Sequence, residues 1–283
     1  MREIAYFISP HGLGHAARAC ALMDHLHRLQ PGIHFSIFTT APEWFFQHSL
    51  RGPFTLHRQS IDIGIIQKTP LEEDLEETIS KLAKLIPFSS SLVLALAAQV
   101  SALGCQAVIC DIAPLGIAVA KAAGIPSILV ENFTWDWIYQ GYLLQEPRFH
   151  AYIQYLGEVF TQADVHIQTQ PICRYSDSAS LVTLPVGRSP RLQANEIHSH
   201  LGIPGGAQMI LATLDGIPQD LNIEHSLPVC QDLFFVISGI KSELTLVDNR
   251  LYLPPHSGFY YPDLVNASRI IISKAGYSTV AEA

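Results

Sequence analysis

Residues 4–26, IAYFISPHGLGHAARACALMDHL, decide the fold. Ile4–Ser9 is an apolar run that predicts a buried strand, and Pro10 ends it. After a loop with glycines, His15–Leu29 carries apolar residues at helical spacing, which predicts a helix that ends before Pro31-Gly32. A short buried strand followed by such a helix is the repeating unit of a parallel α/β sheet covered on both faces.

The same alternation of strand and helix patterns continues along the chain. An acidic stretch, Glu72–Glu77, is expected to open a long helical region that Pro87 interrupts, and Leu115–Ala123 is expected to form a further helix. Further strands are expected at Ile33–Thr39, Phe54–Ser60, Ala107–Cys110, Ser127–Val130, Val165–Gln168, Met209–Thr213, Leu233–Ile237 and Arg269–Ile272.

The pattern restarts after Ala163, which predicts two α/β domains in series. We place them at residues 1–175 and 176–283, with a linker at 185–190 that contains two prolines and a glycine. The last predicted helix has only just begun at Ala283, whereas helices average about 11–12 residues. The second domain is therefore expected to be incomplete.

Composition excludes several classes of protein. Of the 283 residues, 48% are hydrophobic and 15% are charged, a balance that favours a folded core over disorder. The net charge of −8 argues against a nucleic-acid partner. No apolar run reaches the roughly 20 residues of a transmembrane helix, and none has the pattern of a signal peptide. The five cysteines include no C-x-x-C pair, so we expect a cytoplasmic protein without disulfide bonds.

The first glycine loop suggests a ligand site. Gly12 and Gly14 let the backbone turn sharply and approach a bound molecule closely, and the following helix start presents free N–H groups. With Ala17 they match the dinucleotide fingerprint G-x-G-x-x-A. That fingerprint also requires Asp or Glu about 20 residues later, where this chain has Thr39-Thr40, so NAD(P) binding is a minor alternative.

His15 is the candidate general base of this loop. A histidine at a strand-to-helix turn can accept a proton near neutral pH, and Asp111 at the end of a buried strand can orient it. Two other interpretations stay open: a local hydrogen bond for His15, and capping of the helix near Pro114 by Asp111. His11 and His15 have a zinc-like spacing, but the sequence lacks the H-E-x-x-H pattern, and we expect no metal.

A second loop, residues 270–282 with the sequence IIISKAGYSTVAE, repeats the order of apolar strand, glycine loop and helix start. Such a helix start can hold a diphosphate without a metal ion. Glu282, one turn into the helix, can accept hydrogen bonds from a ribose diol. Alternatively, Thr279 and Glu282 form a capping box that needs no ligand, and the sequence leaves both interpretations open.

Together the two loops resemble those of GT-B glycosyltransferases. The chain is most similar to the glycosyltransferase-like N-terminal domain of plant L-arabinokinase and its bacterial relatives, and more distantly to the N-acetylglucosaminyltransferase that completes lipid II. The residues that carry the resemblance are His11–Arg18, Asp111–Pro114, Glu131–Tyr139 and Lys274–Ala283. The chain departs from the superfamily at Leu214-Asp215-Gly216, where a glycine pair is usual.

The resemblance implies two Rossmann-like domains that face each other across a cleft. The first would hold the acceptor and the second a nucleotide-sugar, UDP-linked in most members. His15 takes the position of the family's base and Asp111 that of the residue orienting it. The residues implied to contact the donor are Gly276, Tyr277, Ser278, Thr279 and Glu282.

The implied reaction is a single inverting displacement that uses the donor as a substrate and needs no cofactor. A non-catalytic nucleotide-sugar-binding regulatory module of the same fold is the main alternative, and a GT-B epimerase is a further one. The acceptor is unknown. Because relatives that act on lipid-linked acceptors dock on membranes, peripheral membrane contact is left open, although the chain has no basic amphipathic helix of that kind.

Overall fold

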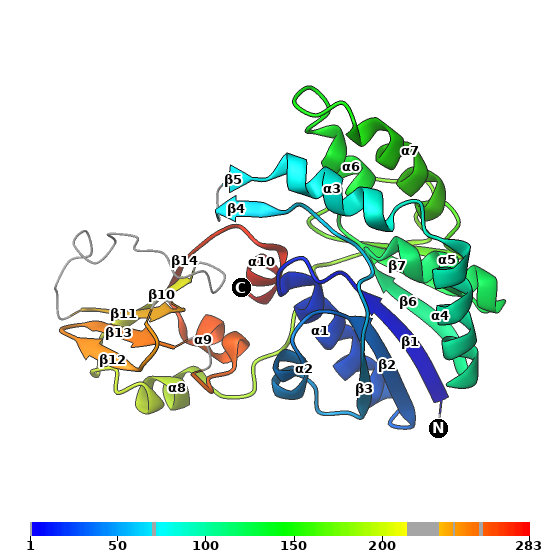
Figure 1. Ribbon diagram of the computed structural model, residues 1–283. Helices are drawn as coiled ribbons and strands as arrows, with labels where there is room; N and C mark the ends of the chain where they lie inside the picture. Colours follow the sequence, from blue (N-terminus) through cyan, green and yellow to red (C-terminus); the bar gives the residue numbers. More distant parts are fainter. Residues whose placement is uncertain (1, 70–71, 214–231, 240, 255–256) are drawn as a thin grey trace. The chain divides into compact units, whose positions relative to one another are not determined.

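The computed structural model describes residues 2–69, 72–213, 232–239, 241–254 and 257–283 (Figure 1). The chain divides into two compact units, Met1–Val186 and Gly187–Ala283. Each unit contains its own largely parallel sheet with helices against it. The predicted class, α/β with two parallel sheets, is confirmed.

The first unit is built on a seven-stranded sheet in the order β3-β2-β1-β6-β7-β8-β9, with every neighbouring pair parallel. A short antiparallel pair, β4 (Gln67–Thr69) and β5 (Glu72–Glu73), lies outside this sheet. The strands of the large sheet are β1 (Arg2–Ile8), β2 (Ile33–Thr39), β3 (Phe54–Arg58), β6 (Cys105–Asp111), β7 (Ser127–Glu131), β8 (Val165–Thr169) and β9 (Leu181–Thr183).

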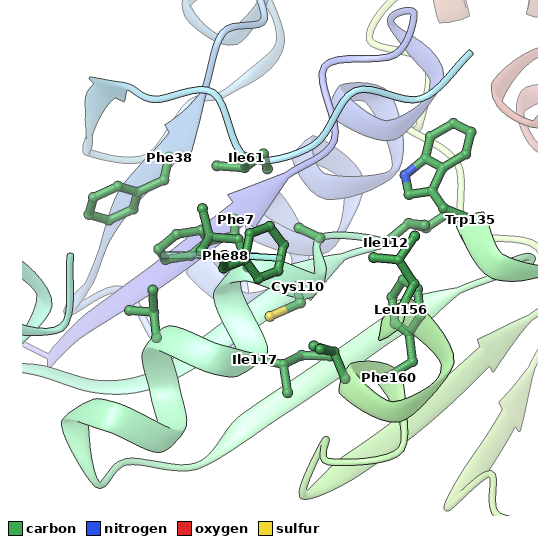
Figure 2. Close-up of a cluster of buried hydrophobic side chains, with 14 of the residues drawn as sticks. Phe7, Phe38, Ile61, Phe88, Cys110, Ile112, Ile117, Trp135, Leu156 and Phe160 are labelled. Atoms are coloured by element: carbon green, nitrogen blue, oxygen red, sulfur yellow. The ribbon is translucent and has the colours of Figure 1, made fainter. Parts of the chain in front are cut away.

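Helices cover both faces of this sheet, because successive strand residues point to opposite sides. In β1, Tyr6 and Ile8 pack with α1 and α2, while Ala5 and Phe7 join a larger cluster with α3 to α7. Figure 2 shows this larger cluster, including Phe7, Phe38, Ile117 and Leu156. The helices are α1 (Gly14–Leu29), α2 (Glu43–Ser49), α3 (Leu75–Leu85), α4 (Ser90–Ala102), α5 (Pro114–Ala123), α6 (Trp135–Gln140) and α7 (Phe149–Phe160).

The second unit has a five-stranded sheet in the order β12-β13-β11-β10-β14, parallel except for the pair of β12 and β13. Its core includes Met209, Leu211, Phe234 and Val236 on one face of the sheet. The elements are α8 (Ala194–His200), β10 (Gln208–Thr213), β11 (Leu233–Ser238), β12 (Thr245–Val247), β13 (Arg250–Leu253), α9 (Tyr261–Ala267), β14 (Ile270–Ser273) and α10 (Tyr277–Glu282).

The acidic stretch at 72–77 does not form a continuous helix start as expected. Glu72 and Glu73 pair with β4, and α3 begins only after Asp74, whose carboxylate accepts a hydrogen bond from the backbone N–H of Glu77 at 2.9 Å. An N-cap aspartate fixes where a helix begins because it satisfies a free N–H of the first turn. The expected break at Pro87 separates α3 from α4.

The division between the units falls after Val186, later than the boundary expected at residue 175. The physical reason is β9, which pairs in parallel with β8 and thereby belongs to the first sheet. Leu181 and Val182 are half exposed, so this edge strand carries no apolar pattern that the sequence reveals.

Among the described residues, no single helix is long and apolar enough to cross a membrane. The helices α3 and α4 meet the length and composition criteria only when taken together, and they are bent by 70° relative to each other.

Candidate active site

The order of strands brings His15 and Asp111 together at one edge of the first sheet. β1 and β6 are parallel neighbours, and Ile8 at the end of β1 lies opposite Asp111 at the end of β6. Carboxyl ends of parallel strands form the usual ligand crevice of such sheets. The loop after β1 turns through Gly12, whose φ of +70° favours glycine, and α1 then begins at Gly14.

His15, Arg18 and Asp111 form a buried hydrogen-bonded group. The Nδ1 atom of His15 lies 2.9 Å from the Oδ1 atom of Asp111. The Arg18 guanidinium binds the same carboxylate through two nitrogens, with Nε donating to Oδ2 at 2.8 Å and Nη2 to Oδ1 at 2.6 Å. The exposed fractions are 8% for His15, 1% for Arg18 and 0% for Asp111. Such two-pronged contacts fix geometry as well as charge.

Asp111 is held as a carboxylate. Burial by itself raises its pKa, but the charge and hydrogen bonds of Arg18 and the contact with His15 lower it, and the net pKa lies below the usual value. A carboxylate only accepts hydrogen bonds, so Nδ1 of His15 is the donor in their contact. In the neutral ring Nε2 is then the nitrogen that can take a proton, which is the arrangement a general base requires.

Two interpretations left open by the sequence are thereby decided. The N-cap of α5 is Ala113, and the Asp111 carboxylate bonds to His15 and Arg18, so Asp111 is not the cap of that helix. His15 bonds to a residue far along the chain rather than locally.

Arg18 is a site residue that the sequence analysis missed. Its Nη1 donates to Asn132 Oδ1 at 2.6 Å and lies 3.3 Å from Thr169 Oγ1. One guanidinium thus joins the ends of β6, β7 and β8. A signal was present, because Arg18 lies three residues after His15 and therefore on the same helix face.

Aromatic side chains enclose the two histidines. The ring centroids of His15 lie 5.8 Å from Phe133 and 6.4 Å from Trp135, and those of His11 and Trp135 are 5.2 Å apart. Trp135 also stacks on Tyr139 with centroids 6.1 Å apart. All of these aromatic residues come from the segment 131–139, which carried part of the resemblance in the sequence.

The loop at 274–283 is organised differently from the capping box that the sequence left open. Helix α10 begins at Tyr277 with Gly276 as its N-cap, so Thr279 is already inside the helix, and its hydroxyl lies 3.2 Å from that of Tyr261. The T-x-x-E interpretation is therefore wrong, because it requires Thr279 as the N-cap, whereas the N-cap is Gly276, three residues earlier.

Glu282 is bound by Arg188. The guanidinium donates from Nε to Oε1 at 2.7 Å and from Nη2 to Oε2 at 3.2 Å, and the Arg188 backbone N–H lies 3.4 Å from Oε1. The carboxylate is fully buried. Gly187 lets these segments pack closely, since an added Cβ would lie 2.5 Å from the carbonyl oxygen of Ala281. The departure at 214–216 lies outside the described residues.

No family model matches the chain. Over 284 residues it is 26% identical to L-arabinokinase of Arabidopsis thaliana, a match that covers 99% of this chain and 27% of that protein. Among solved structures, a UDP-glucosyltransferase from Polygonum tinctorium superposes with a TM-score of 0.62, and the glycosyltransferase SnogD from Streptomyces nogalater with 0.58. Both are 15% identical over all of this chain, which covers 77% and 78% of theirs. The fold is that of the GT-B glycosyltransferases.

The GT-B fold agrees with the resemblance seen in the sequence, including the similarity to L-arabinokinase. Within this fold the chain supplies two separate groups of candidate residues. His15 and Asp111, with Gly12 and Gly14 in the adjoining loop, belong to the first unit. Residues 276–279 and Glu282 belong to the second unit. The chain spans about a quarter of the length of L-arabinokinase.

Proposed function

We propose that the protein is a glycosyltransferase that moves a sugar from a UDP-linked nucleotide-sugar to an acceptor hydroxyl by a single inverting displacement. The observation that carries the proposal is the buried pair of His15 and Asp111 at the carboxyl end of a sheet with the GT-B fold. The pair has the parts of a general base: a histidine, a carboxylate that orients it, and a cation that keeps the carboxylate ionised.

In the proposed reaction Nε2 of His15 removes the proton of the acceptor hydroxyl as its oxygen attacks the anomeric carbon. The bond from that carbon to the diphosphate oxygen breaks, and the nucleoside diphosphate leaves with the electron pair. Asp111 stabilises the positive charge that the His15 ring gains. Arg18 neutralises Asp111 from the other side, so the carboxylate stays charged throughout.

The donor is assigned to the second unit. Gly276, Tyr277, Ser278 and Thr279 would lie along the diphosphate, where backbone N–H groups at the start of α10 supply the positive field. Glu282 is assigned to the ribose, which it would meet by exchanging part of its contact with Arg188, because the carboxylate is fully buried against that guanidinium in this structure. The proposal uses no metal ion or cofactor. The N–H groups stabilise the negative charge on the departing diphosphate, and His15 takes the proton of the acceptor hydroxyl.

Two solved structures with the same fold support the choice of donor. A structure of Phytolacca americana UGT2 is a complex with UDP-2-fluoroglucose and pterostilbene, and the Polygonum tinctorium protein is a UDP-glucosyltransferase capable of glucosylating indoxyl.

The test is UDP release from UDP-sugars in the presence of an acceptor library, for the wild type and for His15→Ala. We expect turnover to fall by about 10²–10⁴, because general-base catalysis contributes that much, with donor affinity nearly unchanged. His25→Ala is the matched control, since His25 is exposed on the same helix. Equal turnover in His15→Ala and the wild type contradicts the assignment of the base.

A regulatory module that binds a nucleotide-sugar without turnover is the second candidate. One observation favours it: the curated relative is named as a kinase, and this chain matches 27% of it. The same experiment separates the two, because such a module binds the donor but releases no UDP with any acceptor.

A further inference from the structure

Asp62 is a buried carboxyl beside the site that the proposed reaction does not use. It lies in the segment between β3 and β4, with an exposed fraction of 5%. Its Oδ2 accepts a hydrogen bond from the indole Nε1 of Trp135 at 3.1 Å. Among the described residues, Oδ1 and the Ser9 hydroxyl are both buried without a hydrogen bond of ordinary geometry. Buried polar atoms without partners are rare in native proteins, and a catalytic role is one of the reasons that explain them.

The surroundings of Asp62 raise the pKa of its carboxyl into the neutral range. Burial raises its pKa, the Ser9 hydroxyl and the Trp135 indole lower it, and the negative charge of Asp111 raises it, with a net value of about 7. The two carboxyls of the site are therefore tuned in opposite directions, since the pKa of Asp111 is lowered. Divergent environments of this kind separate carboxyls with different roles.

The other titratable groups around this segment come from three elements. Arg18 and His15 reach from α1 and bind Asp111. His11, in the loop after β1, packs on Trp135 and on Gly64, where an added Cβ would lie 2.7 Å from its Nδ1. Tyr139 on α6 donates to the carbonyl of Gly64 at 2.9 Å, and burial, then Asp62, raise its pKa well above the usual value. Tyr139 thus stays neutral.

Trp135 connects Asp62 to the proposed base. Its indole is held by Asp62 at the nitrogen, by Tyr139 through stacking, and it packs on the rings of His11 and His15. The indole therefore limits how the His15 ring can rotate about its contact with Asp111. Charged acceptors make hydrogen bonds roughly twice as strong as neutral ones. The hydrogen bond from the Trp135 indole is therefore stronger when Asp62 is ionised than when it is protonated.

We propose that Asp62 is a positioning residue for His15, which it holds through the Trp135 indole, and that protonation of Asp62 loosens this hold. A protonated carboxyl can instead donate to the Ser9 hydroxyl. The role in catalysis rests on the proposed function, in which His15 is the base. The contact itself is measurable without any transfer activity.

The test follows the indole N–H resonances of the ¹⁵N-labelled chain across neutral pH. The chain has three tryptophans, and Trp135→Phe identifies the resonance of Trp135. In the wild type we expect this resonance to move with a midpoint near the Asp62 pKa of about 7. In Asp62→Asn, which keeps an oxygen acceptor, the movement should vanish. Trp44, which is partly exposed and contacts Phe45, is the internal reference.

Ser9→Ala provides a second variant that keeps the carboxyl. Because the Ser9 hydroxyl lowers the pKa of Asp62, its removal should move the midpoint to higher pH. A Trp135 resonance that stays still in the wild type overturns the proposal. So does a titration that persists in Asp62→Asn, since it then belongs to a histidine, or an unmoved midpoint in Ser9→Ala.

The catalytic part is tested by the pH dependence of UDP release. We expect Asp62→Asn to lower kcat by about tenfold through loss of orientation, with the donor KM unchanged, and to alter the pH profile of kcat, because the ionisation of Asp62 no longer contributes to it. A variant with the wild-type pH profile overturns the positioning role and leaves the proposed function intact. If the wild type releases no UDP with any acceptor, the proposed function fails, whereas the resonance of Trp135 still decides the role of Asp62.

Discussion

Arg18 donates two hydrogen bonds to Asp111 and a third to Asn132, so a single guanidinium joins the ends of neighbouring strands. It is an arginine with an exposed fraction of only 1%. A buried cation and a buried carboxylate are tolerated only together, because each alone would lose its hydration without compensation. Arg18 and Asp111 therefore stay charged only as a pair, and the hydrogen bond that orients His15 depends on the charged Asp111 carboxylate.

Arg18→Ala should destabilise the chain by about 3–5 kcal/mol, because it leaves Asp111 buried without its cation. Urea unfolding followed by circular dichroism measures this change. Arg28→Ala is the matched control, since Arg28 is exposed at the end of the same helix, and it should change stability by less than about 0.5 kcal/mol. Equal stability of the two variants would show that the buried contacts are not formed.

Asp62→Asn should stabilise the chain, and more so at high pH. The pKa of Asp62 is raised from 3.8 to about 7, so the folded chain keeps this proton in a range where the unfolded chain has lost it. Stability from this group is therefore present at low pH and decreases as the pH rises through about 7. The Tm difference between variant and wild type should be larger at about pH 8 than at about pH 5. A constant difference would contradict the raised pKa.

At the scale of elements, the predictable parts are those where local pattern and burial agree. Ile33–Thr39 was expected as a strand and is one, because all but one of its residues are buried and its ends are marked by Gly32 and a polar turn. The strands β9 and β12 have three residues each and exposed apolar side chains, so neither shows the burial pattern of a strand, and each is defined by its pairing with β8 or β13.

The site follows the same rule. His15 and Asp111 were predictable because strand ends of a parallel sheet meet at one edge. The roles of Arg18 in a helix and of Asp62 in an apolar loop were not predictable. Charged residues are expected at the surface, and only the structure shows that these two are buried. The T-x-x-E pattern misled because the helix start is set by Gly276, and Glu282 pairs with Arg188 instead of capping.

Gly116 sets how closely α5 packs on the first sheet. A Cβ at this position would lie 2.7 Å from Cys110 Sγ and 2.8 Å from Phe7 Cβ. Gly116→Ala should therefore destabilise the chain by about 1–3 kcal/mol through overpacking, as measured by thermal unfolding. Gly32→Ala is the control, because nothing lies within 4 Å of its added Cβ. A stabilised Gly116→Ala would mean that α5 lies further from β1 and β6.

At the scale of the whole molecule, the two units divide the work that we propose. Each has its own sheet and its own buried clusters, and the candidate residues lie at the carboxyl ends of strands in both. The first unit carries the proposed base, His15, and the residues that hold it, whereas the second carries the loop that we assign to the donor. Binding of a nucleotide-sugar is the property that the proposal requires of the molecule as a whole.

The most direct test is a thermal-shift comparison of UDP, UDP-sugars, GDP and NAD with this chain and with the longest natural form that contains it. A ligand at about 100 times its Kd stabilises by about 2.7 kcal/mol, which moves Tm by a few degrees. The account predicts a shift with uridine ligands that is lost in Glu282→Gln and kept in Glu243→Gln, an exposed control in the same unit. A shift with NAD and none with any uridine ligand would contradict it.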